Sequence, residues 1–261
     1  MPAPEATVTL VADLGSTPRT GGPTETVPPP PRGVRLGATI AGQVWRDARD
    51  QFLREVVGRP PRRPWMKHRE IDLLSELVRA LRPQRALEWG AGYSTLYFPT
   101  LLPPGARWTA IEHDGVWASI VRRRDPGPNV EILHVPADRF PWTDDYGDGA
   151  YDDLRRYVDA AERFAPLDFV LVDGRARRAC VHRALDCIGD RGVVVLHDAN
   201  RTAYRATFDG YPQQLLLLDG RTGSGGLWIG SRGANLEALI HADTHRRIWH
   251  LYARIGAYVR L

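Results

Sequence analysis

The sequence has few cysteines, a single lysine and no long apolar run. Cys180 and Cys187, the only two cysteines, lie seven positions apart in a segment with a helical pattern. Seven helical residues span roughly 10 Å along the axis, which is too far for a disulfide, and two thiols are too few for a zinc site. We therefore expect both cysteines to be buried, unpaired thiols.

These absences also bear on location. The sequence has no stretch of about eighteen apolar residues to span a membrane, and the N-terminus lacks the basic and apolar regions of a secretory signal. Hydrophobic residues make up 43% and charged residues 25% of the chain, which is typical of a globular domain. We therefore expect a cytoplasmic protein with a sizeable core.

The formal net charge is +4, and the basic residues are almost all arginine because Lys67 is the only lysine. One run of basic residues without an acid is either solvated or holds an anionic group; it consists of Arg59, Arg62, Arg63, Lys67 and Arg69. Aromatic and basic residues are not interleaved as on surfaces that stack nucleobases. We expect no nucleic-acid partner.

The two ends of the chain differ from its middle. Residues 1–36 are rich in Pro, Gly, Thr and Ala and are predicted to be a disordered tail, because they bury too little apolar surface to offset the entropy of ordering. Residues 37–82 carry helical patterns at 41–57 and 68–81 and are predicted to cap the substrate site. Residues 233–261 form a helical extension whose apolar face either packs on the domain or makes a homodimer surface.

Residues 83–232 alternate short apolar runs with helical segments. The runs are residues 85–89, 108–112, 130–135, 169–173, 193–197, 214–218 and 226–230. Strands that alternate with helices indicate an α/β fold, a parallel sheet with right-handed crossovers. The turn-rich loop 219–225 indicates that the last two strands form an antiparallel hairpin. The sequence therefore predicts a domain built on a sheet of about seven strands.

The most informative stretch is segment 87–95, with the sequence LEWGAGYST, where the first buried strand turns into a helix. Gly90 and Gly92 let the backbone turn sharply and approach a ligand closely, and Ser94 or Thr95 can cap the helix. In open α/β sheets, ligands bind at this carboxyl edge of the strands. We therefore expect a ligand site here.

Acidic residues on neighbouring strands indicate which ligand. Glu112 ends the second strand, where a carboxylate can accept hydrogen bonds from both hydroxyls of a ribose, and Asp138 follows the third strand, where it could accept an adenine amine. A dinucleotide fingerprint needs a third glycine where this chain has Thr95. A carboxylate at Glu88 suits a sulfonium and an ammonium group better than it suits pyrophosphate. These residues favour S-adenosylmethionine (SAM) over a dinucleotide.

At these positions the chain resembles the class I SAM-dependent methyltransferases. Residues 88–95 are similar to motif I of that family, residues 168–175 to its fourth motif and residues 192–198 to its fifth strand, so that the resemblance covers roughly residues 66–230. It implies a doubly wound, Rossmann-like sheet of seven strands, mostly parallel with one antiparallel strand, with helices on both faces and SAM as the methyl donor. The implied cofactor contacts are Glu88, Gly90, Ala91, Gly92, Ser94, Glu112, Asp138 and Asp173.

Asp173 and Asp198 each follow a buried strand, so both are expected over one crevice, where they must be hydrogen-bonded, paired or bound to metal. In a first role they bind a divalent cation such as Mg²⁺, which would hold and acidify a hydroxyl. Cation-dependent small-molecule O-methyltransferases, which the chain resembles, have such a site. The chain departs from their pattern because Ala199 occupies the place of the third ligand, for which Asn200 could substitute.

Two other roles stay open for these residues. In the second, His197 or Asp198 acts as a general base without metal; a regular strand points such neighbours to opposite sides, so we expect Asp198 to face the substrate. In the third, Asp198 pairs structurally with an arginine. The arginines considered are Arg175, Arg178 and Arg201, which with Tyr204 are also placed to line an acceptor pocket. The candidate catalytic residues are thus Asp173, His197 and Asp198.

The leading interpretation is O-methylation of a small-molecule or sugar hydroxyl. The insertion 141–166, rich in aromatic and acidic residues, and the segment 65–68 could close over the acceptor. N-methylation uses the same cofactor loop and stays open. A nucleotide-dependent oxidoreductase is disfavoured by Thr95 and Glu88, and a non-catalytic adaptor would keep the fold without needing Glu112.

Overall fold

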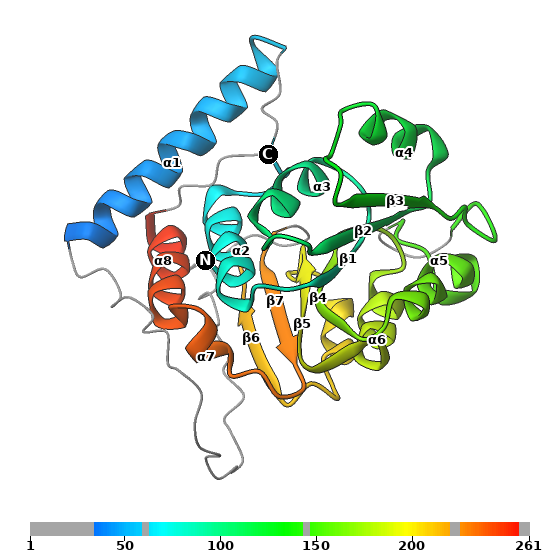
Figure 1. The fold of residues 1–261 in the computed structure, drawn as a ribbon. Helices are drawn as coiled ribbons and strands as arrows, with labels where there is room; N and C mark the ends of the chain where they lie inside the picture. The colour runs from blue at the N-terminus through cyan, green and yellow to red at the C-terminus, as the bar shows by residue number, and fades with distance from the viewer. Residues whose placement is uncertain (1–33, 59–62, 143–146, 220–224, 256–261) are drawn as a thin grey trace.

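The protein folds around one seven-stranded sheet (Figure 1). The structure is a computed structural model that describes residues 34–58, 63–142, 147–219 and 225–255. The strands are β1 (Arg85–Trp89), β2 (Arg107–Glu112), β3 (Val130–His134), β4 (Leu167–Val172), β5 (Ile188–His197), β6 (Gln213–Leu217) and β7 (Leu227–Ser231). Their order is β3-β2-β1-β4-β5-β7-β6. Only β7 runs antiparallel to its neighbours, β5 and β6, so the predicted fold class is confirmed.

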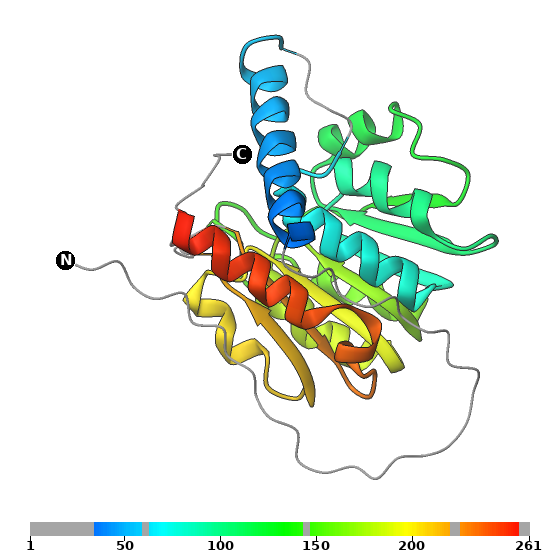
Figure 2. The same cartoon turned by 90° about the vertical axis from the view of Figure 1, so that its left-hand side faces the viewer.

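Helices cover both faces of the sheet (Figures 1 and 2). One face packs against α2 (His68–Leu81), η1 (Phe98–Leu101), α4 (Gly115–Arg122), α7 (Leu236–Leu239) and α8 (Ala242–Ile255). The other packs against α5 (Arg155–Asp159), η3 (Ala160–Phe164), α6 (Arg177–Cys187) and η4 (Thr202–Thr207), and the short η2 (Tyr151–Asp153) precedes α5 without a buried residue. The short helix α3 (Tyr93–Tyr97) follows β1, and α1 (Val34–Glu55) contacts α2 and α8 while its far end projects from the body.

Side chains alternate between the two faces along the central strands, as the period of two requires. In β4, Phe169 and Leu171 pack into the core under α2 and α8, whereas Val170 and Val172 pack against α5 and α6. Full burial of such side chains stabilises the fold by roughly 1.5–3 kcal/mol each. The carboxyl ends of β1, β4 and β5 are therefore held by packing on both sides of the sheet.

The terminal segments extend the core. The helix predicted at 41–57 begins earlier, at Val34, so it takes in the end of the tail expected over residues 1–36; residues 1–33 lie outside the described residues. α2 and α8 pack in one core cluster, with Ile248 and Tyr252 of α8 buried, so the C-terminal extension packs on the domain. None of the described helices is long and apolar enough to cross a membrane. Cys180 and Cys187 are buried and unpaired, as predicted.

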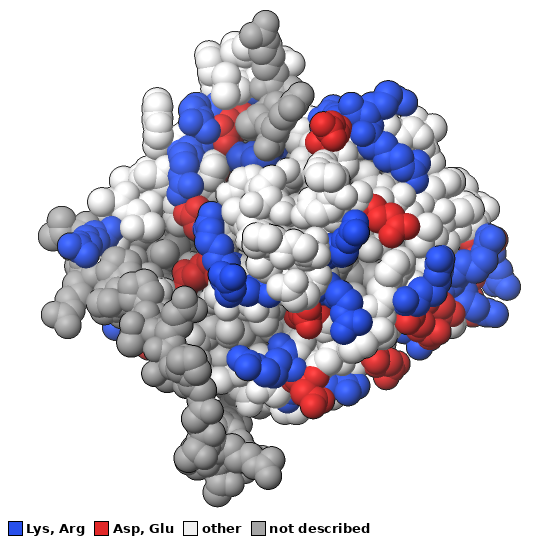
Figure 3. Space-filling model, in the orientation of Figure 1, with Lys and Arg blue, Asp and Glu red and all other residues white. Residues whose placement is uncertain are grey.

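The run of basic residues does not form a solvated basic face in the part of the chain that the structure describes. Arg63 pairs with Asp50, and both Lys67 and Arg69 pair with the buried Asp219. Figure 3 shows basic and acidic side chains interspersed on one face of the molecule. The sequence pattern suggested a basic face because the carboxylate that pairs with each of these cations is distant in the chain.

Candidate active site

A cleft of about 420 Å³ opens at the carboxyl edge of the sheet. The ends of β1, β2, β4 and β5 all contribute to its walls, which is where ligands bind in open α/β sheets. Its lining consists of Trp65, Gly90, Ala91, Gly92, Tyr93, Ser94, Glu112, His113, Asp114, Trp117, Asp173, Gly174, Arg175, Arg177, His197 and Asp198. The cleft thus brings together all but two of the predicted site residues, Glu88 and Asp138.

The glycine loop lies against the end of β4. Gly90 has φ +99°, and a Cβ there would overlap the backbone of Gly174. This position therefore needs glycine for both its conformation and its close approach. Gly92 differs from the expectation of a sharp turn, because its backbone is extended at φ −176°. A Cβ on Gly92 would meet only the Ser94 hydroxyl, at 3.7 Å.

Glu88 lies beneath the loop and does not line the cleft. Its carboxyl group accepts hydrogen bonds from the hydroxyls of Ser94 and Thr95 and, at 3.0 Å, from Nε1 of Trp108. Burial raises the pKa of Glu88 to about 8, against the opposing effect of these bonds. Ser94 and Thr95 thus donate to Glu88 rather than cap α3 by themselves; Thr95 Oγ1 also accepts from the N–H of Gly92, the N-cap, at 2.8 Å.

Glu112 lines the cleft and ties two strand ends together. Its Oε2 accepts from the N–H of Ala91 and its Oε1 from the N–H of Asp114, both at 2.9 Å. Asp138 lies elsewhere: its carboxylate accepts from the backbone N–H of Arg156 at 3.0 Å and pairs with the Arg156 side chain. The structure therefore brings Glu112 to the glycine loop and keeps Asp138 outside the cleft.

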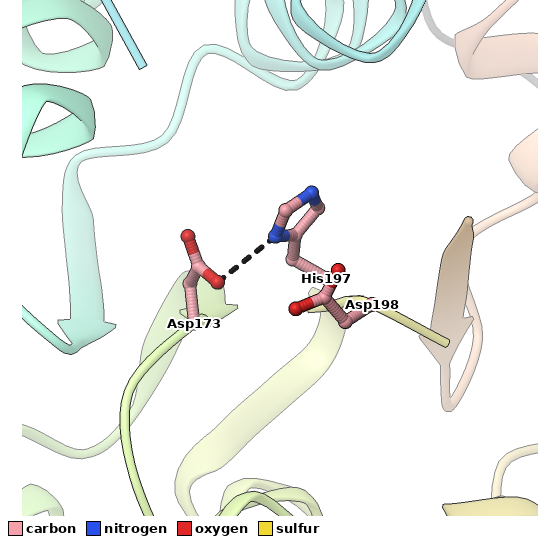
Figure 4. A group of neighbouring side chains, drawn as sticks. All are labelled: Asp173, His197 and Asp198. Atoms are coloured by element: carbon pink, nitrogen blue, oxygen red, sulfur yellow. Dashed lines mark hydrogen bonds and ion pairs between the residues drawn. The ribbon is translucent and has the colours of Figure 1, made fainter. Parts of the chain in front are cut away.

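Asp173, His197 and Asp198 lie together at the ends of β4 and β5 (Figure 4). His197 Nδ1 is 2.9 Å from Asp173 Oδ1. The expectation that His197 and Asp198 point to opposite sides was wrong, because Asp198 has φ +60° and so leaves the regular strand geometry. This left-handed conformation, rare in a residue other than glycine, brings both side chains into one cluster.

Glu70, a residue that sequence reasoning missed, approaches the other side of the His197 ring. Its Oε2 lies 3.5 Å from Nε2 of His197 and also accepts from the N–H of Lys67 at 2.8 Å. Burial alone would lower the pKa of His197, but the charges of Asp173 and Asp198 and the bond to Glu70 raise it well above 6.5. The imidazole therefore lies between carboxylates whose charges favour its protonated form.

Arg177, at the first turn of α6, is the second missed residue. Its buried guanidinium lies 3.3 Å from Asp173 Oδ1 and 3.2 Å from Asp198 Oδ2. Burial would raise the pKa of Asp198, but the charges of His197 and Arg177 hold it below its usual range. No sequence signal indicated this pair, because Asp173 lies in the loop before α6 and the i, i+4 rule applies within a helix.

The three arginines considered from the sequence lie in different surroundings. Arg175 lines the cleft, and its guanidinium lies 5.7 Å from the ring centre of Trp142. Arg178 is exposed, and Arg201 lies 3.7 Å from Asp198. Tyr204 is buried and donates to Asp148 at 2.9 Å, outside the cleft lining.

The insertion 141–166 contributes no residue to the cleft lining among its described residues, and residues 143–146 of it lie outside them. Trp65 supports the other predicted covering segment, because it lines the cleft with Tyr93 and Trp117. The ring of Trp65 stacks on Tyr93 at 5.7 Å and lies 6.2 Å from Trp117, while 58% of the residue is exposed.

Comparison with solved structures supports the fold. A candidate caffeoyl-CoA O-methyltransferase from Staphylococcus aureus matches with a TM-score of 0.50 and 14% identity over 77% of this chain and 100% of that chain. The chain has the class I methyltransferase fold. A methyltransferase-like protein from Silicibacter pomeroyi matches at 22% identity (TM-score 0.46; 71% of this chain, 98% of that chain).

An O-methyltransferase from Bacillus cereus in complex with SAH matches at 16% identity (TM-score 0.48; 74% of this chain, 90% of that chain). No family model and no curated protein matches the sequence. In this methyltransferase fold, the glycine loop and Glu112 face the cleft from β1 and β2, and the cluster of Asp173, His197 and Asp198 faces it from β4 and β5.

Proposed function

We propose that the protein is a SAM-dependent methyltransferase that transfers a methyl group to a hydroxyl of a small molecule. One observation carries the proposal: the glycine loop, Glu112 and the polar cluster at the ends of β4 and β5 line one cleft. Its volume of about 420 Å³ lies within the range of small-molecule sites. Bound SAM would supply an electrophilic methyl group on a sulfonium.

The residues of the cleft fit the cofactor. At Gly92 the missing side chain leaves the loop open towards the cleft, since a Cβ there would meet no other residue's atom closer than 3.7 Å. Glu112 supplies a carboxylate at the tip of β2, where a ribose diol would be bound. Glu88 acts indirectly, because it holds Ser94 and Thr95 and so fixes the loop from beneath.

The acceptor side is built around Asp173. Its Oδ1 is held by His197 and Arg177, while Oδ2 accepts no hydrogen bond from the described residues and points away from the His197 ring (Figure 4). We assign Oδ2 to the acceptor hydroxyl. Asp173 would hold the acceptor hydroxyl towards the methyl group that bound SAM would supply, and would take up the hydroxyl proton as the oxygen is methylated. Catalysis then depends chiefly on alignment.

The exposed aromatic side chain of Trp65 supports a planar acceptor, because such a ring would stack on it at the mouth of the cleft. Tyr93 and Trp117, which also line the cleft, contact the Trp65 ring. We therefore favour phenolic hydroxyls among the acceptors.

Transfer of tritium from methyl-labelled SAM to a panel of phenols, sugars and amines tests this function. We expect labelled phenol ethers and stoichiometric S-adenosylhomocysteine. Labelling of amines alone would replace O-methylation by N-methylation. SAM binding without transfer to any acceptor class would contradict an enzymatic role.

A further inference from the structure

One of the residues that line the cleft, Arg177, is a buried cation. Arg177 is 7% exposed and reaches from α6 to the ends of both β4 and β5. Its Nη1 donates to the carbonyl of His197 at 2.9 Å and its Nε to the carbonyl of Gly174 at 3.0 Å. These two backbone bonds fix the guanidinium between Asp173 and Asp198 independently of its charge pairing.

A divalent cation held by the same aspartates needs open oxygen ligands. Asp173 Oδ1 already faces His197 and Arg177. Asp198 Oδ1 accepts the N–H of Gly225 at 2.6 Å, and its Oδ2 faces Arg177. A metal ion between these carboxylates would lie close to a fixed guanidinium, and the two like charges would repel each other strongly in a buried site.

Of the four carboxylate oxygens of Asp173 and Asp198, only Asp173 Oδ2 has no partner among the described residues, and one open oxygen does not make a cation site. The other candidate ligands supply nothing further. Ala199, in the place of a third ligand, is buried and offers only a methyl group. Asn200, the substitute considered from the sequence, uses its amide for the chain after β6: Nδ2 donates to the carbonyl of Asp219 at 3.2 Å, and Oδ1 accepts the Asp219 N–H at 2.9 Å. The side chains present therefore do not fit a divalent cation.

We propose that Arg177 is the resident cation of this site: it neutralises and positions Asp173 and Asp198, and the protein needs no divalent metal. The catalytic role of Arg177 rests on the proposed function. The position of Arg177 in place of a metal ion between the two aspartates does not. Arg177 acts as a positioning residue, because it touches the aspartates rather than the acceptor. Its permanently charged guanidinium holds Asp173 Oδ1 and so leaves Oδ2 directed at the acceptor.

Manganese binding tests the proposal directly. The full chain, stripped with EDTA, is titrated with Mn²⁺ while electron paramagnetic resonance reports the free ion. We expect no stoichiometric binding by the wild type. Arg177→Met uncovers two carboxylates and should bind Mn²⁺ at least tenfold more tightly than the wild type, whereas Arg177→Lys, which keeps the charge, should not.

Two variants check where the ion binds. Arg183→Met removes an arginine of the same helix that pairs with Asp159 and Glu162 and should leave the protein unable to bind Mn²⁺. Adding Asp198→Asn to Arg177→Met should abolish the acquired binding. If Arg177→Met does not fold, the wild-type titration still decides.

Binding of one Mn²⁺ per wild-type chain at micromolar concentration, lost in Asp198→Asn, would overturn the proposal. Parallel calorimetry with SAM separates the two claims. A wild type that binds neither Mn²⁺ nor SAM would contradict the proposed function and leave Arg177 as the resident cation. A wild type that binds both SAM and Mn²⁺ would support the proposed function and contradict the assignment of Arg177 as the resident cation.

Discussion

Oε2 of Glu70 lies 3.5 Å from Nε2 of His197, so α2, which precedes the sheet in the chain, contributes a charge to the end of β5. Glu70 also accepts from the N–H groups of Lys67 and Gly226, at 2.8 and 3.3 Å. It therefore joins α2, β5 and the start of β7. α2 is part of the candidate site because of this carboxylate.

Glu70→Gln should lower the free energy of unfolding by about 3–5 kcal/mol, because it removes one member of a buried ion pair. Urea unfolding measures this loss. The ring protons of His197 should titrate at lower pH in the variant, since the bond to Glu70 helps to raise the pKa of His197. The exposed Glu131→Gln should change neither quantity, and an unaltered His197 titration in Glu70→Gln would contradict the pairing.

Glu88 should make the stability depend on pH. Its pKa is raised from 4.5 to about 8 by burial, so the folded state holds a proton that the unfolded state has lost. The free energy of unfolding should then fall as pH rises from 4.5 to 8, by up to about 1.4 kcal/mol per pH unit from this group. Glu88→Gln should lack this contribution.

The comparison of Glu88→Gln with the wild type cancels the other titrating groups. Urea unfolding at pH 5, 6, 7 and 8 should show the variant gaining stability relative to the wild type as pH rises. A constant difference across this range would mean that Glu88 is ionised in the folded protein.

Trp65 should contribute to ligand binding and little to folding, because 58% of it is exposed. Trp65→Ala should weaken SAM or acceptor binding by roughly 3- to 10-fold, the equivalent of about 0.5–1.5 kcal/mol for an aromatic contact. Trp45→Ala is the matched control, since Trp45 is 67% exposed on α1 and does not line the cleft. Equal affinities in the two variants would remove Trp65 from the site.

Much of the fold was predictable because its signals are local. The apolar runs located all seven strands, and residues 85–89 match β1 at both ends. The loop that contains Gly90 and Gly92 correctly indicated where the cleft lies. The sharp turn expected at Gly92 was wrong, since of these two glycines only Gly90 has a positive φ; the expected close approach of Gly92 to a ligand stays a prediction.

The details of the site depend on contacts between distant segments, which no local pattern encodes. Glu70 reads as an ordinary residue of the first turn of a helix, and Arg177 as one arginine among several. Asp198 adopts a positive φ that sequence alone does not predict for an aspartate. Because of this conformation, its side chain lies beside that of His197. Glu88 was expected to contact the cofactor. In the structure its carboxyl group accepts hydrogen bonds from three donors and supports the glycine loop from beneath.

Calorimetric titration of the purified protein with SAM and, in parallel, with NADH tests the central claim most directly. We expect one SAM per chain and no NADH. Glu112→Ala should weaken SAM binding by about 1–3 kcal/mol, whereas the exposed Glu131→Ala on neighbouring β3 should not. Binding of NADH alone, or of SAM with equal affinity by wild type and Glu112→Ala, would contradict the assignment of this cleft as the methyl-donor site.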